Sequence, residues 1–213
     1  MASRNTRAVQ RTCLLISDVQ NDYCSPGGKL FDRSNKRPEV IAEFVDQVAR
    51  LLQSARAAGI KVAFIRNTHL RGGLDVSAER LERLRSATPG ATVNDASCIE
   101  GTWGHRVVDA LDVREDNFVI DKFGYGLFEY SIIDKVLRAH ALTDIVLTGI
   151  ASYGGILAAV PALNDRDYRF TIPRECVAGY DAELHEAAMK LLKPHLVGVA
   201  DVIAAWTSGG SPR

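Results

Sequence analysis

Short apolar runs that alternate with longer amphipathic stretches constrain the fold of this chain more than any other feature. The runs predicted as buried strands are Cys13–Ser17, Lys61–Ile65, Phe118–Ile120, Ile145–Leu147 and Tyr168–Ile172, and Leu196–Ala200 fits a short edge strand. The stretches predicted as helices are Glu39–Ala58, Ser77–Ser86, Ser131–His140, Gly155–Asn164 and Ala182–Leu192. Strands separated by helices of this length form right-handed βαβ units. We therefore expect an α/β fold with a mostly parallel sheet that helices cover on both faces.

Size and charge narrow the class of protein. The chain has 213 residues, 46% of them hydrophobic, which is enough for one sizeable core and predicts a single domain over 1–213 with flexible ends at 1–11 and 207–213. Its 26 basic residues balance 26 acidic ones. No general field therefore attracts nucleic acid or an anionic membrane. We expect a small-molecule substrate instead.

The sequence offers no targeting or metal-binding pattern. No apolar run approaches the roughly 20 residues of a membrane-spanning helix, and Met1–Thr12 lacks the apolar stretch of a secretory signal, so we expect a cytoplasmic protein. The four cysteines are widely separated, and the five histidines follow no ligand spacing. We expect reduced thiols, no metal site and no cofactor.

Polar side chains follow two of the predicted strands. Asp18 comes directly after Cys13–Ser17, and Lys122 follows Phe118–Ile120 after one residue. In parallel sheets functional groups gather beyond the carboxyl ends of the strands. A capping role for Asp18 and a solvated role for Lys122 are the structural alternatives. The two opposite charges together favour a site in which they bind a polar substrate and tune each other's pKa.

A glycine-rich turn, Gly149–Gly155, follows the strand Ile145–Leu147. It lacks the GxGxxG order and the Walker lysine of nucleotide-binding turns, so phosphate binding is disfavoured. Ser152 lies in no GxSxG elbow, and the sequence shows no obvious histidine partner for it. We interpret Ser152 as a helix N-cap. The repeated arginines Arg80, Arg83 and Arg85 are typical of a solvated helix face.

Four stretches resemble the isochorismatase-like hydrolase superfamily, also called the cysteine hydrolases. They are Leu15–Tyr23, Glu100–Gly104, Asp121-Lys122 with Phe128, and Thr148–Ala151. The resemblance implies a three-layer α/β/α, Rossmann-like fold with a six-stranded parallel sheet, commonly assembled as a homodimer or tetramer. It also implies a catalytic Asp, Lys and Cys, of which Asp18 and Lys122 match the first two. The expected substrate-binding residues are Tyr23, Asn67, Phe128, Ile150, Ala151, Ser152, Tyr153 and Gly154.

The third catalytic position is Gly155 in this chain. Without a thiolate, the acyl-enzyme route of the amidase branch has no nucleophile. The isochorismatases proper carry a glycine there, and in them the aspartic acid protonates an enol ether, with no covalent intermediate. The resemblance therefore favours acid-catalysed hydrolysis of an enol ether or a related small carboxylate by Asp18 and Lys122.

Other readings stay open. Isochorismatases have a glutamine and a histidine where this chain has Asn67 and Tyr153, which indicates a reshaped pocket. One alternative is an amide or ureido C–N hydrolase whose cysteine has been replaced, in nature or by design. Another is a non-catalytic ligand-binding relative. His69 does not complete the metal site of nicotinamidase relatives, and the resemblance implies a cis peptide bond at Ile150–Ala151.

Overall fold

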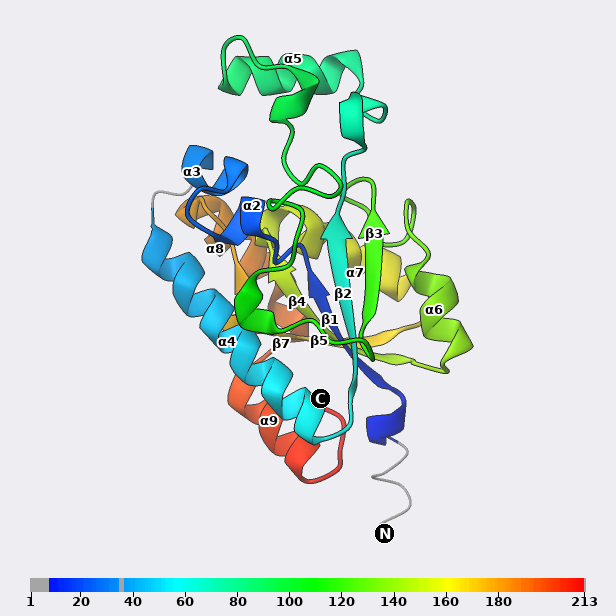
Figure 1. Ribbon diagram of the computed structural model, residues 1–213. Coiled ribbons are helices and arrows are strands. Elements are labelled where there is room, and N and C mark those ends of the chain that lie inside the picture. Colours follow the sequence, from blue (N-terminus) through cyan, green and yellow to red (C-terminus); the bar gives the residue numbers. More distant parts are fainter. Residues whose placement is uncertain (1–7, 35–36, 213) are drawn as a thin grey trace.

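The computed structural model describes residues 8–34 and 37–212, and these build three layers around a parallel sheet (Figure 1). The strands are β1 (Thr12–Ser17), β2 (Lys61–Asn67), β3 (Phe118–Lys122), β4 (Asp144–Ile150), β5 (Arg169–Pro173), β6 (Val177–Ala178) and β7 (Leu196–Val197). The helices are α2 (Asn21–Cys24), α3 (Lys29–Ser34), α4 (Pro38–Ala57), α5 (Ala78–Ala87), α6 (Ile133–Ala139), α7 (Leu157–Asn164), α8 (Ala182–Leu192) and α9 (Val199–Thr207).

The sheet has the order β3-β2-β1-β4-β5-β7, with β6 paired to β4, and every ladder in it is parallel. The central strand, β1, is buried at all six of its positions. A parallel strand covered on both faces needs such a continuous apolar run. The order brings the carboxyl ends of β1, β2, β3 and β4 to one edge of the sheet.

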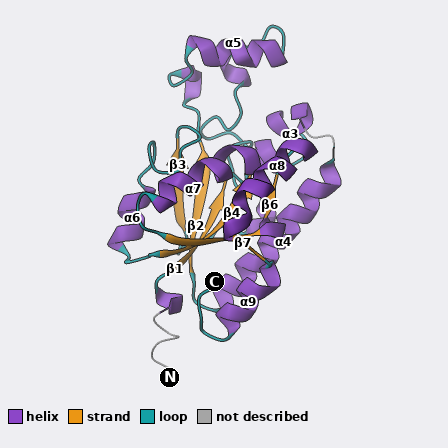
Figure 2. Cartoon of the chain, turned by 180° about the vertical axis from the view of Figure 1, so that it is seen from behind, coloured by secondary structure: helices purple, strands orange, loops and turns teal. Residues whose placement is uncertain are grey.

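Alternate residues of β1 separate two cores. Leu14 and Ile16 pack with α4 and α9 on one face, whereas Cys13 and Leu15 pack with α6 and α7 on the other. Figure 2 shows these helices on opposite sides of the strands. The three-layer architecture expected from the sequence is therefore confirmed.

The structure differs from the predicted elements mainly at the two shortest strands, β6 and β7. The run Leu196–Ala200 pairs with β5 only at Leu196–Val197, and the chain then turns at Gly198 into α9, which the sequence reading missed. Val199, Val202 and Trp206 are the buried residues of α9. Because these three residues lie on one face of a helix, the chain forms a helix here in place of the longer edge strand that the apolar run predicts. The sheet thus has seven strands where six were expected, because the two-residue β6 joins it.

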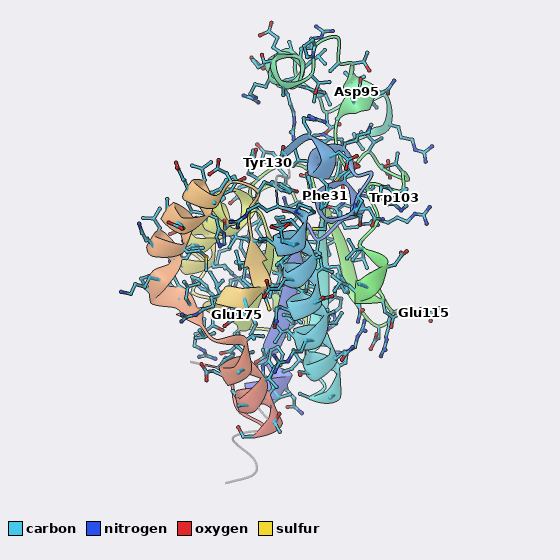
Figure 3. All side chains as sticks on the ribbon, turned by 90° about the vertical axis from the view of Figure 1, so that its left-hand side faces the viewer. Phe31, Asp95, Trp103, Glu115, Tyr130 and Glu175 are labelled. Atoms are coloured by element: carbon cyan, nitrogen blue, oxygen red, sulfur yellow. The ribbon has the colours of Figure 1, made fainter. Side chains whose placement is uncertain are left out.

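The segment between β2 and β3 makes an excursion beyond the carboxyl ends of the strands (Figure 1). It carries α5, which has no buried residue of its own. Asp95 of this excursion lies on the α5 side of the molecule, while Phe31 of α3 lies nearer the sheet (Figure 3).

The ends of the chain and its helices bear on two further expectations. Of the segments expected to be flexible, 1–7 and 213 lie outside the described residues, while 8–10 form a helical turn and 207 ends α9. The single-domain assignment stays a prediction. No helix in the described part is long and apolar enough to cross a membrane.

Candidate active site

Asp18 occupies the first position after β1, where the chain leaves the sheet. Its backbone has φ 64°, in the left-handed region that aspartate tolerates better than most residues. Its N–H donates to the carbonyl of Ile65 on β2 at 2.8 Å, so the neighbouring strand fixes the turn. The residue is only 4% exposed. A carboxyl group is therefore held in a nearly dry position at the sheet edge.

Lys122, the last residue of β3, meets this carboxyl group. Its Nζ lies 3.1 Å from Asp18 Oδ2, and its side chain is 3% exposed against 6% for Asp18. Ser17 Oγ also donates to Oδ2, at 3.1 Å. Burial raises the pKa of Asp18, while the positive charge and hydrogen bond of Lys122 oppose that rise. Asp18 is thus a buried carboxyl whose pKa lies above its ordinary value, with Lys122 limiting the rise.

Both members of the pair keep unused hydrogen-bonding capacity. Asp18 Oδ1 is buried and has no hydrogen-bond partner among the described residues. Lys122 Nζ donates to the carbonyl of Gly124 at 2.8 Å as well as facing Asp18, which occupies two of its three N–H groups. One carboxylate oxygen and one ammonium N–H can therefore serve a ligand.

The turn after β4 completes this edge of the site. Gly149 has φ 142°, and a Cβ atom there would lie 2.1 Å from the carbonyl oxygen of Ser17, so only glycine fits. The Ile150–Ala151 peptide is cis, as the resemblance implies. A π-helical turn, Ser152–Ile156, then leads into α7. π-turns of this kind occur frequently at functional sites.

Gly155 faces the acid within this turn. A Cβ atom at position 155 would lie 3.1 Å from Asp18 Oδ2, and its backbone is not in the left-handed region. A side chain at 155 would thus project directly beside the Asp18–Lys122 pair, with only a small adjustment. That position 155 is the family's nucleophile position stays a prediction.

Asp18 and Lys122 line a cavity of about 600 Å³, the size of a small-molecule site, whereas Gly155 is not among its lining residues. Its lining includes most of the residues expected from the sequence, namely Asp18, Tyr23, Asn67, Lys122, Ile150, Ala151, Tyr153 and Gly154. It also includes residues that the sequence reading did not assign to the site, namely Leu30, Ser34, Arg80, Gly124, Tyr125, Ala158 and Tyr180. The wall is therefore rich in tyrosine and carries three charged side chains.

A chain of hydrogen bonds orients the polar wall. Asn67 Nδ2 donates to the Tyr23 hydroxyl at 2.8 Å, and Tyr180 donates to the Tyr23 carbonyl at 2.8 Å. The side chain of Gln20, fully buried, accepts from the Asn67 N–H at 2.8 Å and donates to the Asn67 carbonyl at 2.9 Å. The end of β2 is thereby locked to the loop that follows Asp18.

A second polar network lies beneath the end of β3. Arg66 makes two hydrogen bonds to Asp121, at 2.8 and 3.1 Å, and His105 Nε2 lies 3.5 Å from the same carboxylate. Burial acts to raise the pKa of Asp121, but hydrogen bonds from His105 and Arg66 outweigh this effect and lower the pKa to about 2. This network ties β2 to β3 directly beside Lys122.

Two of the expected substrate-binding residues lie elsewhere. Phe128 is buried in the core, where its ring stacks on Tyr168 with centroids 5.9 Å apart. Ser152 is fully buried and makes no capping hydrogen bond. Its Oγ instead lies 2.9 Å from Nδ1 of His185 on α8. The N-cap interpretation of Ser152 is wrong, and the histidine partner was missed because it lies 33 residues away in the chain.

None of the cysteines can act in place of a residue-155 thiol. All four are buried and free, and none of them lines the cavity. Burial raises the pKa of each thiol, to about 12 for Cys13 and Cys176 and well above the ordinary value for Cys24 and Cys98. A thiol in such surroundings stays protonated and is a poor nucleophile.

His69, at the start of the excursion, is bound to a carboxylate. Its Nδ1 lies 2.6 Å from Asp75 Oδ2. Among the described residues, no group of three His, Cys, Asp or Glu side chains lies close enough to hold a metal ion.

Comparison with known proteins places this geometry in a family. The isochorismatase domain family matches residues 12–204. The chain belongs to the isochorismatase-like hydrolases. The match spans every strand of the sheet and both members of the charged pair.

Individual relatives agree with this assignment. The chain is 30% identical over 209 residues to a ureidoacrylate amidohydrolase of Methylobacterium radiotolerans, covering 94% of this chain and 80% of the relative. A cysteine hydrolase from Pseudomonas syringae has a TM-score of 0.78 at 22% identity, with 94% of each chain covered. N-carbamoylsarcosine amidase from Thermoplasma acidophilum has a TM-score of 0.68 at 18% identity, covering 89% of this chain and 96% of the other. The two structural likenesses bear on the fold alone.

Proposed function

We propose that this isochorismatase-family protein hydrolyses a C–N bond in a small ureido or amide carboxylate. The observation that carries the proposal is the buried Asp18–Lys122 pair, facing position 155 at the end of a small-molecule cavity. The similarity to ureidoacrylate amidohydrolases supports this substrate class over the enol ether expected from Gly155. We propose Asp18 and Lys122 as the catalytic residues, with Tyr23, Asn67 and Tyr153 binding the substrate.

The reaction has to proceed without a thiolate. A Cβ atom at 155 would have Asp18 Oδ2 as its nearest neighbour, at 3.1 Å, so without a side chain there the space beside that carboxyl can admit a water molecule. Ionised Asp18 would take a proton from that water while its oxygen attacks the ureido carbonyl carbon. The unused N–H of Lys122 would stabilise the oxyanion of the tetrahedral intermediate.

Breakdown of the intermediate returns the proton. Protonated Asp18 donates it to the leaving nitrogen as the C–N bond breaks, which yields an amine and a carbamic acid from a ureido substrate. The carbamic acid decomposes to ammonia and carbon dioxide. Water is a weaker nucleophile than a thiolate, so we expect slow turnover.

Enol-ether hydrolysis is the second candidate, and the raised pKa of Asp18 favours it. A protonated Asp18 would deliver its proton to the vinyl carbon, and water would capture the resulting oxocarbenium ion. The hemiketal formed would then collapse to an alcohol and a ketone. This route needs no nucleophile at Gly155, and the glycine would leave room for a ring.

Parallel assays separate these candidates. Ammonia release from ureidoacrylate and a panel of small amides tests the first, and pyruvate release from isochorismate tests the second. We expect ammonia release that Asp18→Asn reduces by at least about 10²-fold, the usual size of general acid–base catalysis. Turnover of isochorismate alone would replace the proposal by the second candidate. No turnover of either substrate, with Asp18→Asn binding ligands unchanged, would favour a non-catalytic binding protein.

We also propose, from the resemblance, a cytoplasmic homodimer or tetramer. Light scattering on the purified full chain tests the assembly. A mass equal to one chain at micromolar concentration would refute it.

A further inference from the structure

The cavity contains a cation that the proposed chemistry does not use. Arg80, on α5, lines the cavity together with Asp18 and Lys122, although it comes from the excursion and not from the sheet. Its backbone N–H donates to the Ser77 side chain at 3.2 Å, which caps the helix and fixes its first turn. The sequence pattern predicts that this arginine belongs to a solvated helix face. The structure turns it toward the site.

The guanidinium of Arg80 has no internal partner. Across the described ranges, 8–34 and 37–212, it makes no ion pair. Of the three acidic residues near it in sequence, Glu82 is exposed, and the other two are engaged elsewhere. Asp75 binds His69, and Glu79 accepts from Ser77 at 2.9 Å. A half-buried arginine therefore presents its donors to the cavity without a counter-ion.

The charge of the cavity wall follows from this. Among the described residues Asp18 is the one acidic residue in the lining, and Lys122 already neutralises it. Arg80 thus leaves one uncompensated positive charge, and protonation of Asp18 would only increase it. The charge of Arg80 also affects His69. Burial and then the positive charge of Arg80 lower the pKa of His69, whereas Asp75 acts to raise it.

We propose that Arg80 binds the carboxylate of a monoanionic substrate whose reacting group lies at Asp18 and Lys122. A guanidinium offers two parallel N–H donors that match the two oxygens of a carboxylate. The tyrosines that line the same cavity suit a short organic spacer. The inference rests on the proposed function in one respect, that this cavity is the substrate site, and it assigns the residue that recognises the carboxylate of the substrate.

The chain offers a matched control on the same helix. Arg83 lies one turn from Arg80 on α5, is exposed and does not line the cavity. Both arginines lie on a helix without buried residues, so neither substitution should disturb the core. Arg80→Ala and Arg83→Ala remove the same charge from the protein, but only the first removes it from the cavity.

Ligand binding tests the inference without requiring turnover. The probes are 3-ureidopropionate and its uncharged methyl ester, titrated by calorimetry into the full chain. We expect Arg80→Ala to weaken binding of the acid by roughly tenfold to a hundredfold, as for a lost charge-assisted hydrogen bond. It should leave binding of the ester within about twofold, and Arg80→Lys should recover part of the loss. Arg83→Ala should change neither.

The opposite results are equally clear. Equal loss for acid and ester would show that Arg80 only shapes the cavity, and no loss for either would show that it does not contact the ligand. Failure of the unaltered protein to bind the acid would also overturn the inference. Arg80-dependent binding of the acid without ammonia release would instead refute the proposed reaction and leave the carboxylate site standing.

Discussion

Replacing Gly155 by cysteine tests most directly how the site works. Position 155 is sterically suited to a side chain, because its φ lies outside the left-handed region and its Cβ would point at Asp18 Oδ2 from 3.1 Å. The added thiol would therefore lie beside a carboxylate able to take its proton and an ammonium able to stabilise the thiolate. Removing the nucleophile of a hydrolase lowers kcat by up to about 10⁶-fold. In a pocket not otherwise adapted to it, we expect Gly155→Cys to raise kcat/KM for ureido and amide substrates by about 10²-fold or more.

The same distance sets the effect on stability. A contact of 3.1 Å is tighter than most Cβ contacts, so the Asp18 carboxylate has to move by a few tenths of an ångström. We expect the free energy of unfolding to fall by about 1 kcal/mol, equivalent to a decrease in Tm of roughly 2–4 °C for a chain of this size. Calorimetry on Gly155→Ala measures this steric part alone.

Steady-state ammonia release and intact-mass spectrometry provide the assay. Gly155→Cys should form a covalent acyl adduct during turnover, and Gly155→Ala should not. If the cysteine variant is no faster than the alanine variant on any ureido or amide substrate, the pocket is not that of a C–N hydrolase. The reasoning from Asp18 and Lys122 to amide chemistry would then be refuted.

Three further predictions concern the framework of the site. Lys122→Met leaves Asp18 buried without its cation and raises the pKa of that carboxyl further. The free energy of unfolding should therefore fall by roughly 3 kcal/mol at pH 8 and by less as the pH is lowered, because a protonated Asp18 needs no cation. A loss in Tm that does not change with pH would contradict this. Gly59→Ala should lower the free energy of unfolding by roughly 1 kcal/mol, and Gly149→Ala by several times as much, as measured by denaturant unfolding. Both glycines have a positive φ, but only a Cβ atom at 149 would clash with a neighbouring strand. The pKa of Asp121 is lowered to about 2 from its ordinary 3.8, so the stability that this residue contributes is present above pH 4 and is lost as the pH falls toward 2. Asp121→Asn should therefore lower the free energy of unfolding by about 1–2 kcal/mol at pH 7, after allowing for solvent screening, and by almost nothing at pH 2. Urea titrations at the two pH values measure this difference.

The sequence predicts those parts of the site that the strand pattern controls. Asp18 and Lys122 each follow a buried run, and the parallel sheet brings the two strand ends to the same edge. The turn that carries Gly155 follows the next strand and reaches the same place. The pattern of apolar runs predicts where these residues lie because each of them is only a few residues from a strand that pairs in register with its neighbours.

The parts that depend on long-range packing could not be read in this way. Arg80 reaches the cavity from a segment that no strand register controls, and Tyr180 follows the two-residue strand β6, which the sequence pattern did not predict. Phe128 lies close to Lys122 in sequence, but its ring packs against Tyr168 in the core, where more apolar surface is buried. The contact of Ser152 with His185 joins two helical segments whose relative placement only the folded chain defines.

The absence of buried residues on α5 has a consequence for how this enzyme can change over generations. The Asp18–Lys122 pair, which we propose as catalytic, belongs to the core of the fold, where most substitutions would endanger the native state. The cation that we assign to substrate choice sits on a helix that contributes little to that core. Mutations in the excursion can therefore alter which acids are accepted while leaving Tm almost untouched, so a lineage can explore new substrates without first accumulating compensating stability.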